Sequence, residues 1–180
     1  MRYEEFTIEG RNAVIEAYRA GRPIDKLFIL DGCQDGPILT IKREAKAKQT
    51  PVKFVTKERL DQLSETGKHQ GVIAYAAAYE YATVEEILDN VRQKGEAPFL
   101  FLLDNIEDPH NLGAIIRTAN LAGAHGVIVP KNRAAGLTAV VAKTSAGALN
   151  FTPVARVTNL AKTIEELKKE GIWFVCADMG

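Results

Sequence analysis

Six polar side chains crowd one turn in the middle of the chain, within DNIEDPHNLGAIIRTANLAGA at residues 104–124. The turn follows an apolar strand-like segment, and ligands of open parallel sheets bind where such strands end. Arg117 falls on the polar face of the following helix, one turn after Gly113, and helical side chains lean towards the helix N-terminus. We therefore expect Arg117 to lie across Gly113 and reach Asn105 and Glu107. An arginine fork beside the free N–H groups of a helix start suits a phosphate, or a hydroxyl next to one.

A structural role explains the same spacing. Arg117 would then pair with Glu107 or Asp108, and Asn111 would be an ordinary helix cap. Structural ion pairs of this kind are common in proteins, and spacing alone does not separate them from a binding site. Both interpretations stay open at this point.

The composition is typical of a soluble cytoplasmic protein with no membrane segment. Of the 180 residues, 46% are hydrophobic and 26% are charged, and no apolar run is long enough to span a bilayer. The first ten residues, MRYEEFTIEG, are too acidic and polar for a signal peptide. Cys33 and Cys176 lie far apart, and neither they nor the histidines show the spacing of zinc ligands. The sequence therefore predicts free thiols and no metal.

Charge is balanced overall but uneven along the chain. The 23 basic and 23 acidic residues cancel, which argues against nucleic-acid binding by bulk charge alone. Basic residues nevertheless gather in one stretch: Lys42, Arg43, Lys46, Lys48, Lys53, Lys57 and Arg59. This stretch is either a solvated helix face or a patch that contacts phosphates.

The alternation of helix and strand patterns predicts two α/β units. Residues 1–77 read as a small domain with helices near 12–20, 37–48 and 57–63 and strands near 26–30, 52–55 and 71–77. Residues 78–98 read as a linker with a helix that starts at the capping box Thr83–Glu86 and ends at Gly95. Residues 99–180 read as strands near 99–103, 126–129, 151–154 and 172–177 alternating with helices near 112–122, 137–149 and 160–170.

The second unit has the pattern of a parallel sheet. FLFLL and GVIV are apolar without alternation, as in strands buried on both faces. Trp173 and Cys176 are expected inside the last strand as core residues. A parallel α/β sheet would continue with a helix after that strand, so we expect the chain to stop short of a complete domain.

The polar turn, taken as a whole string, is similar to a known motif. N-x-x-D-P-x-N-x-G-x-I-x-R-T-A, from Asn105 to Ala119, resembles the first signature motif of the SpoU, or TrmH, family of RNA ribose 2′-O-methyltransferases, of the SPOUT class. IEGRNAV (8–14) and KHQGVIA (68–74) resemble the family's N-terminal RNA-binding domain, which is similar to a ribosomal-protein fold. Three later segments are similar to the branch that methylates a guanosine of large-subunit ribosomal RNA: AHGVIVPK, KTSAGAL and PVARVTNLAKTI.

The resemblance implies transfer of a methyl group from S-adenosylmethionine to a ribose 2′-hydroxyl of RNA. It implies that Arg117 is catalytic and that Asn105 orients it. Arg117 would act either as a base or, more easily for a group with a pKa above about 12, by electrostatic stabilisation of the developing alkoxide. The residues expected to hold the RNA are Arg11, Asn12, Lys42, Arg43, His69, Gln70, Glu107 and Asn111.

The resemblance also implies what these 180 residues do not contain. The family binds its methyl donor with two later motifs in a trefoil knot, through which its members form homodimers, and neither motif is found up to Gly180. We therefore expect no cofactor-binding residue within this chain and no activity of the chain alone. Two alternatives remain: a non-catalytic RNA-binding module, and an unrelated nucleotide- or phosphate-binding enzyme, which the absence of a glycine-rich fingerprint disfavours.

Overall fold

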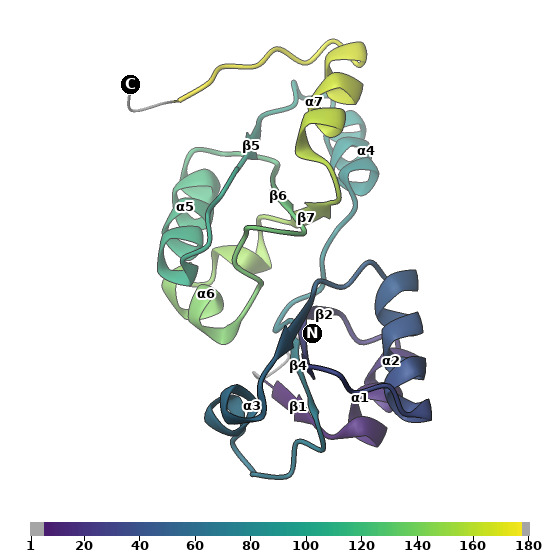
Figure 1. Ribbon diagram of the computed structural model, residues 1–180. Coiled ribbons are helices and arrows are strands. Elements are labelled where there is room, and N and C mark those ends of the chain that lie inside the picture. The colour runs from purple at the N-terminus through teal and green to yellow at the C-terminus, as the bar shows by residue number, and fades with distance from the viewer. Residues whose placement is uncertain (1–5, 178–180) are drawn as a thin grey trace.

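The computed structural model describes residues 6–177 and contains two sheets, each with its own helices (Figure 1). The N-terminal unit comprises β1 (Phe6–Glu9), α1 (Arg11–Arg19), β2 (Ile24–Leu30), α2 (Gly36–Ala47), β3 (Val52–Val55), α3 (Lys57–Leu63) and β4 (Val72–Ala76). The second unit comprises α4 (Val84–Lys94), β5 (Leu100–Leu102), α5 (Pro109–Leu121), β6 (Gly126–Pro130), α6 (Ala139–Thr144), the 3₁₀ turn η1 (Ala148–Asn150), β7 (Val154–Val157) and α7 (Leu160–Lys169). The mixed α/β class expected from the sequence is confirmed.

The N-terminal sheet is mixed and has the strand order β1-β4-β2-β3 among the described residues. β2 runs parallel to β3 and antiparallel to β4, and β1 adds an antiparallel edge that the sequence pattern does not predict. Successive side chains of β2 point to opposite faces, so Leu27 and Ile29 join the core under α1 and α2. Phe28 packs with Leu60 and Ile73 under α3. Helices therefore cover both faces of this sheet.

The second sheet is parallel, in the order β5-β6-β7, and both of its faces are buried. Val127 and Val129 of β6 pack towards α5 and α6, whereas Ile128 packs towards α4 and α7. Figure 1 shows these two helix pairs on opposite sides of the sheet. The unalternating apolar run of β6 is thus explained, because Val127, Ile128 and Val129 all enter a core.

The helix boundaries follow their capping residues. Thr83 accepts a hydrogen bond from the N–H of Glu86, whose carboxylate accepts one from the N–H of Thr83, so the predicted capping box is present. α4 ends at Gly95, which has a left-handed φ of 65°. Asn159 caps α7 by accepting the N–H of Lys162 at 2.9 Å.

Two expected elements differ from the structure. The helix predicted at 137–149 is split, because Ala146 (φ 51°) and Gly147 (φ 88°) adopt left-handed conformations after α6. The strand predicted at 172–177 is not formed in the described residues up to 177, since this segment pairs with no other strand. Its alternate side chains Ile172 and Phe174 pack on the α4–α7 core, and Trp173 is 94% exposed. The predicted burial of Trp173 and Cys176 is therefore wrong.

Candidate active site

The polar turn 104–108 leads from β5 into the start of α5. Asn105 has a φ of 57°, a left-handed conformation that asparagine tolerates better than most residues. The Asp108 carboxylate accepts the N–H of Asn111 at 2.9 Å, and Pro109 occupies the first helical position. Asp108, and not Asn111, is therefore the helix cap. Asn111 lies within the first turn of α5 with its side chain exposed.

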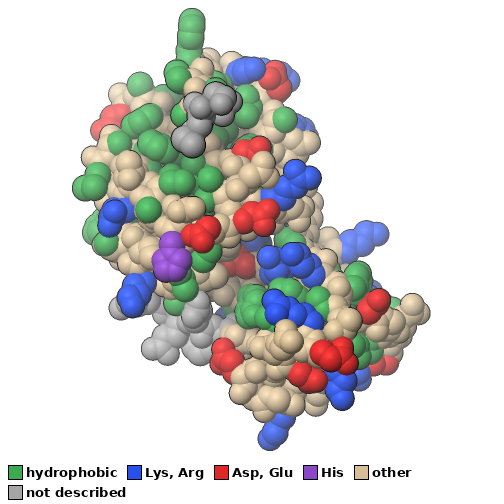
Figure 2. Space-filling view, turned by 60° about the vertical axis from the view of Figure 1, so that its left-hand side comes forward, with side chains coloured by type: hydrophobic (Ala, Val, Ile, Leu, Met, Phe, Trp, Pro, Cys, Tyr) green, Lys and Arg blue, Asp and Glu red, His purple; other side chains and the backbone are tan. Residues whose placement is uncertain are grey.

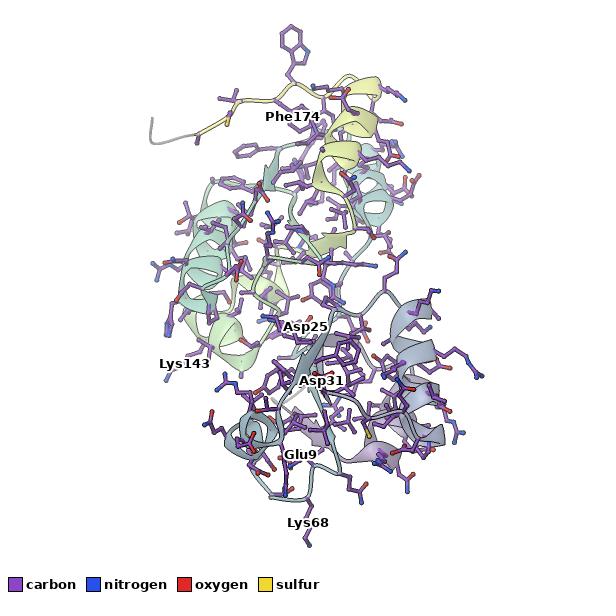
Figure 3. The ribbon with its side chains drawn as sticks, viewed as in Figure 1. Glu9, Asp25, Asp31, Lys68, Lys143 and Phe174 are labelled. Atoms are coloured by element: carbon purple, nitrogen blue, oxygen red, sulfur yellow. The ribbon has the colours of Figure 1, made fainter. Side chains whose placement is uncertain are left out.

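Arg117 is exposed on α5 and lies in a shallow groove between α5 and α6, lined by His110, Ala114, Arg117, Val140, Lys143, Thr144 and Ala146. Within residues 6–177 the side chain of Arg117 makes no hydrogen bond or ion pair, so the structural pairing with Glu107 or Asp108 is not formed. Lys143, also in this groove, projects outward from α6 (Figure 3). The groove thus presents two cationic side chains to solvent.

Gly113 explains why Arg117 does not take the expected position. Its surface is buried against α6, where a Cβ would overlap the hydroxyl of Thr144 and lie 2.8 Å from the Thr144 Cβ. Glycine is therefore required for the close approach of two helices and offers no bare surface for Arg117 to cross. The expectation that Arg117 lies across Gly113 is wrong. No hydrogen bond or ion pair within the described residues joins Arg117 to Asn105 or Glu107, and Glu107 lines a different cavity.

Arg11 and Gln70, two of the expected RNA-binding residues, meet in the N-terminal unit. The backbone N–H of Arg11 donates to Gln70 Oε1 at 3.2 Å, and Arg11 Nε donates to the Gln70 carbonyl at 3.0 Å. The Arg11 guanidinium also pairs with Asp35 at 2.7 Å. Asn12 follows on the exposed side of α1. Arg11 is therefore held in place by its own unit at the start of α1.

His69 is buried and holds the turn that contains Gln70. The residue is 7% exposed, its Nδ1 accepts the N–H of Gly71 at 3.0 Å, and its Nε2 lies 2.9 Å from Asp61. Both ring nitrogens are used within the protein, so His69 fixes the turn in which Gln70 adopts a left-handed φ of 49°. In this structure it positions Gln70 and does not face solvent.

Lys42 and Arg43 lie on α2, at the start of the basic stretch. The Lys42 ammonium donates to the Cys33 carbonyl at 2.9 Å and lies 5.1 Å from the centre of the Phe54 ring. Arg43 is exposed. Phe54, on the edge strand β3, is 55% exposed, which is unusual for a phenylalanine in a sheet. An exposed ring beside basic side chains suits single-stranded nucleic acid, and the sequence pattern gave no sign of it because Phe54 lies in an apolar strand.

A buried ion pair joins the two units and was not expected from the sequence. Arg156 of β7 donates to Asp25 of β2 at 2.7 Å, and the hydroxyl of Tyr81 also donates to Asp25, at 2.5 Å. Asp25 is labelled in Figure 3, where it lies between the two units. The Arg156 guanidinium stacks on the Tyr81 ring at 4.4 Å. Burial raises the pKa of Asp25 while Arg156 acts to lower it, and burial raises the pKa of Tyr81 well above its usual value. Tyr81 therefore keeps the proton that it donates.

Gly136 makes room for this ion pair, because a Cβ at that position would lie 2.8 Å from the Cβ of Asp25.

Among residues 6–177, no group of three or more His, Cys, Asp or Glu side chains is arranged to hold a metal ion. In the same part of the chain no helix is long and apolar enough to cross a membrane.

Comparison with known proteins defines the class to which this fold and site belong. Residues 7–82 match the family described as RNA 2′-O ribose methyltransferase substrate binding, and residues 98–180 match the SpoU rRNA methylase family. The chain is 48% identical over 169 residues to the "Putative TrmH family tRNA/rRNA methyltransferase YacO" of Bacillus subtilis, covering 94% of this chain and 68% of that protein. The chain belongs to the SpoU (TrmH) family of RNA methyltransferases.

Other similar proteins carry related descriptions. A "Putative TrmH family tRNA/rRNA methyltransferase" of Staphylococcus epidermidis is 46% identical over 170 residues, which are 94% of this chain and 68% of that protein. A crystal structure of the SpoU methyltransferase AviRb from Streptomyces viridochromogenes, in complex with AdoMet, is 23% identical with a TM-score of 0.45. That match covers 93% of this chain and 59% of the AviRb chain, so the present chain spans well under two thirds of the solved protein.

Proposed function

We propose that this chain is the RNA-holding and arginine-bearing part of an S-adenosylmethionine-dependent RNA methyltransferase. The expected product is a ribose 2′-O-methyl group, on a guanosine of large-subunit ribosomal RNA, formed in the cytoplasm. The observation that carries the proposal is Arg117: an exposed guanidinium on the signature helix, with no hydrogen-bonding or ionic partner in residues 6–177, in a groove that another cation, Lys143, also lines. Family membership supplies the type of reaction.

The described residues do not fit the methyl donor. S-adenosylmethionine supplies an electrophilic methyl group on a positively charged sulfonium. Among the charged side chains that line the groove of Arg117 and the cavity between the two units, cations outnumber anions, and their charge would repel the sulfonium. The other large hollow, beside Tyr18 and Arg22, also contains Lys48, Lys131 and Arg156. We therefore assign no donor-binding residue within the described part of the chain.

Arg117 is suited to the RNA side of the reaction. A guanidinium with free N–H donors can hold a phosphate by two parallel hydrogen bonds and can stabilise negative charge that develops on the neighbouring 2′-oxygen. Its high pKa makes electrostatic stabilisation a better role than proton abstraction. Asn105, which the structure does not bring to Arg117, remains a candidate for contacting the RNA at the start of α5. Glu107 lines the cavity between the two units, where its negative charge would oppose a nearby RNA phosphate. Asn12, Arg43, Asn111 and Lys42 are candidates for further RNA contacts.

A chimeric protein tests the role of Arg117. The curated relatives are longer than the matched region, so the unmatched remainder of the Bacillus subtilis relative is joined after Gly180. Transfer of labelled methyl groups to large-subunit ribosomal RNA and RNA affinity are then measured for Arg117→Ala. We expect transfer to fall by about 10²-fold or more with RNA affinity within a few-fold, because the charge acts mainly in the transition state. Arg19→Ala, an arginine that is 70% exposed on α1, is the matched control.

The binding-module alternative has one observation in its favour, namely that none of the described cavities suits the donor. Equal losses of RNA affinity and methyl transfer in Arg117→Ala would make Arg117 an RNA contact without a catalytic role. RNA binding by the chain, together with no transfer by the chimera, would favour the module.

A further inference from the structure

A cavity of about 440 Å³ lies between the two units. The N-terminal unit lines it with Lys26 and Phe28 of β2 and with Lys53 of β3, and the second unit lines it with Glu107 and the loop that follows β6. On the face shown in Figure 2, lysine and arginine side chains gather where the two units meet. We call this space the interdomain cavity. Its volume lies in the range of small-ligand sites and could not admit a double helix.

Cations outnumber anions in the interdomain cavity. The cationic lining residues are Lys26, Lys53, Lys131, Arg133 and Arg156, and the acidic ones are Asp25 and Glu107. Since Arg156 and Asp25 are paired with each other, four cations share one carboxylate. Within the described residues, the side chains of Lys26, Lys53 and Arg133 make no hydrogen bond or ion pair, and the side chain of Lys131 donates only to the neutral amide of Gln49. The cavity therefore has an unneutralised positive charge.

The cations are also close enough to affect one another. Burial and the neighbouring Lys53 lower the pKa of Lys26, and burial and Arg156 lower the pKa of Lys131. Like charges held together in a partly buried space are unfavourable unless an anion occupies it. Lys26 and Lys53 belong to the N-terminal unit, whereas Lys131 and Arg156 belong to the second unit. An anion bound between these two pairs would therefore contact both units.

The wall of the cavity offers apolar surface beside this charge. Phe28 and Tyr75 pack edge to face, with ring centres 5.4 Å apart, and Pro51 and Pro130 also line the cavity. Aromatic and apolar surface next to lysine and arginine side chains is the combination that single-stranded nucleic acid requires. A nucleotide satisfies both features, because its phosphate meets the cations and its base or sugar meets the apolar wall.

The cavity adjoins the groove of Arg117. Glu107 and Pro109 line the interdomain cavity, and the next residue, His110, lines the Arg117 groove. The first turn of α5 thus borders both spaces. We propose that the interdomain cavity binds one nucleotide of the RNA substrate by its phosphate, held by Lys26 and Lys53 from one side and by Lys131 and Arg133 from the other. This inference rests on the proposed function, and it places a neighbour of the modified nucleotide between the units.

RNA binding by the 180-residue chain tests the inference. Fluorescence anisotropy of a labelled single strand of about 12 nucleotides is recorded over a range of salt concentrations. The double variant Lys26→Gln with Lys53→Gln is expected to bind about tenfold more weakly, and its slope of log K against log salt is expected to be smaller by about 0.7, as for one lost phosphate contact, because both lysines hold the same phosphate. The control Lys94→Gln with Lys169→Gln removes the same charge from exposed ends of α4 and α7.

Glu107→Gln supplies a result that misfolding cannot imitate. It removes the one unpaired carboxylate of the cavity, so RNA affinity is expected to rise about two- to threefold. The inference is overturned if the Lys26 and Lys53 variant loses no more affinity than the control, or if Glu107→Gln weakens binding.

Inorganic phosphate separates the two possible sources of the anion. RNA binding that is equal in wild type and the Lys26 and Lys53 variant, with calorimetric phosphate binding seen only in wild type, would make the cavity a site for a small free anion and overturn the RNA assignment. Failure of the proposed function is seen separately. A chimera that transfers no methyl group, with cavity variants that still lose RNA affinity, would refute the methyl-transfer proposal and leave the RNA contact intact.

Discussion

Removal of Arg156 should reveal how strongly the two units are joined. The Arg156 and Asp25 side chains are 13% and 6% exposed, and their ion pair crosses from β7 to β2 at 2.7 Å. Breaking a buried pair by removing one partner costs about 3–5 kcal/mol. Tyr81 still donates to Asp25 in the variant, so we expect the lower end of that range, about 3 kcal/mol, for Arg156→Met.

A double-mutant cycle measures the interaction itself. Urea unfolding followed by far-ultraviolet circular dichroism is compared for Arg156→Met, Asp25→Asn and the double variant. We expect a coupling free energy of about 2 kcal/mol, within the range found for contacting residues. The control cycle uses Arg19 and Glu16, which are 2.8 Å apart but 70% and 67% exposed, and whose coupling should stay below about 0.5 kcal/mol.

Comparison of the two cycles isolates the effect of burial on the coupling free energy, because the two ion pairs have nearly the same N–O distance and differ in burial. A coupling for Arg156 and Asp25 no larger than that of the exposed pair would refute the view that this ion pair holds the units together. Unfolding of the Arg156→Met variant should also separate into two transitions, since the units then lose their buried ion pair.

Three further outcomes are expected. Gly113→Ala should lower the free energy of unfolding by about 1–3 kcal/mol in a urea titration, because the new methyl group would overlap Thr144; a loss below about 1 kcal/mol would show that α6 can move aside. Burial raises the pKa of Glu9, but hydrogen bonds from the hydroxyl and backbone groups of residues 64–66 more than offset it and bring the pKa from 4.5 to about 2. Its ionised form therefore stabilises the fold above pH 4.5, and this contribution should fade as the pH falls from 4.5 towards 2 in wild type and be absent in Glu9→Gln. Acrylamide should quench the fluorescence of Trp173, which is 94% exposed, almost as well in the native protein as in urea; a protected native tryptophan would contradict the structure of this segment.

Local structure was largely predictable from the sequence. β3 and α3 have the predicted bounds, and Thr56 caps α3 as expected, because a capping side chain and the apolar periodicity act within a few residues. The 172–177 segment shows the limit of the same reasoning. Its run of apolar residues is typical of a strand, but a strand also needs a partner strand, and none is present among residues 6–177.

The candidate site was predictable only in part, for a similar reason. The motif that contains Arg117 could be recognised as a string, whereas the neighbour of Gly113 is Thr144, far away in the sequence. The interdomain cavity is lined by residues of β2 and of the end of β6, which are about a hundred residues apart. Lys26 within a strand and Lys131 after one carry no local sign of sharing a cavity. Long-range packing determines where such sites form, and the pattern of residue types along the sequence does not indicate that packing.

The most direct test of the central claim is the identity of the methylated atom. Large-subunit ribosomal RNA is treated with the chimeric protein and S-adenosylmethionine, digested to nucleosides and analysed by mass spectrometry. We predict a nucleoside whose added methyl group lies on the ribose, as 2′-O-methylguanosine, and none when Arg117 is replaced by alanine. A methyl group on a base, or ribose methylation that persists in Arg117→Ala, would contradict the account.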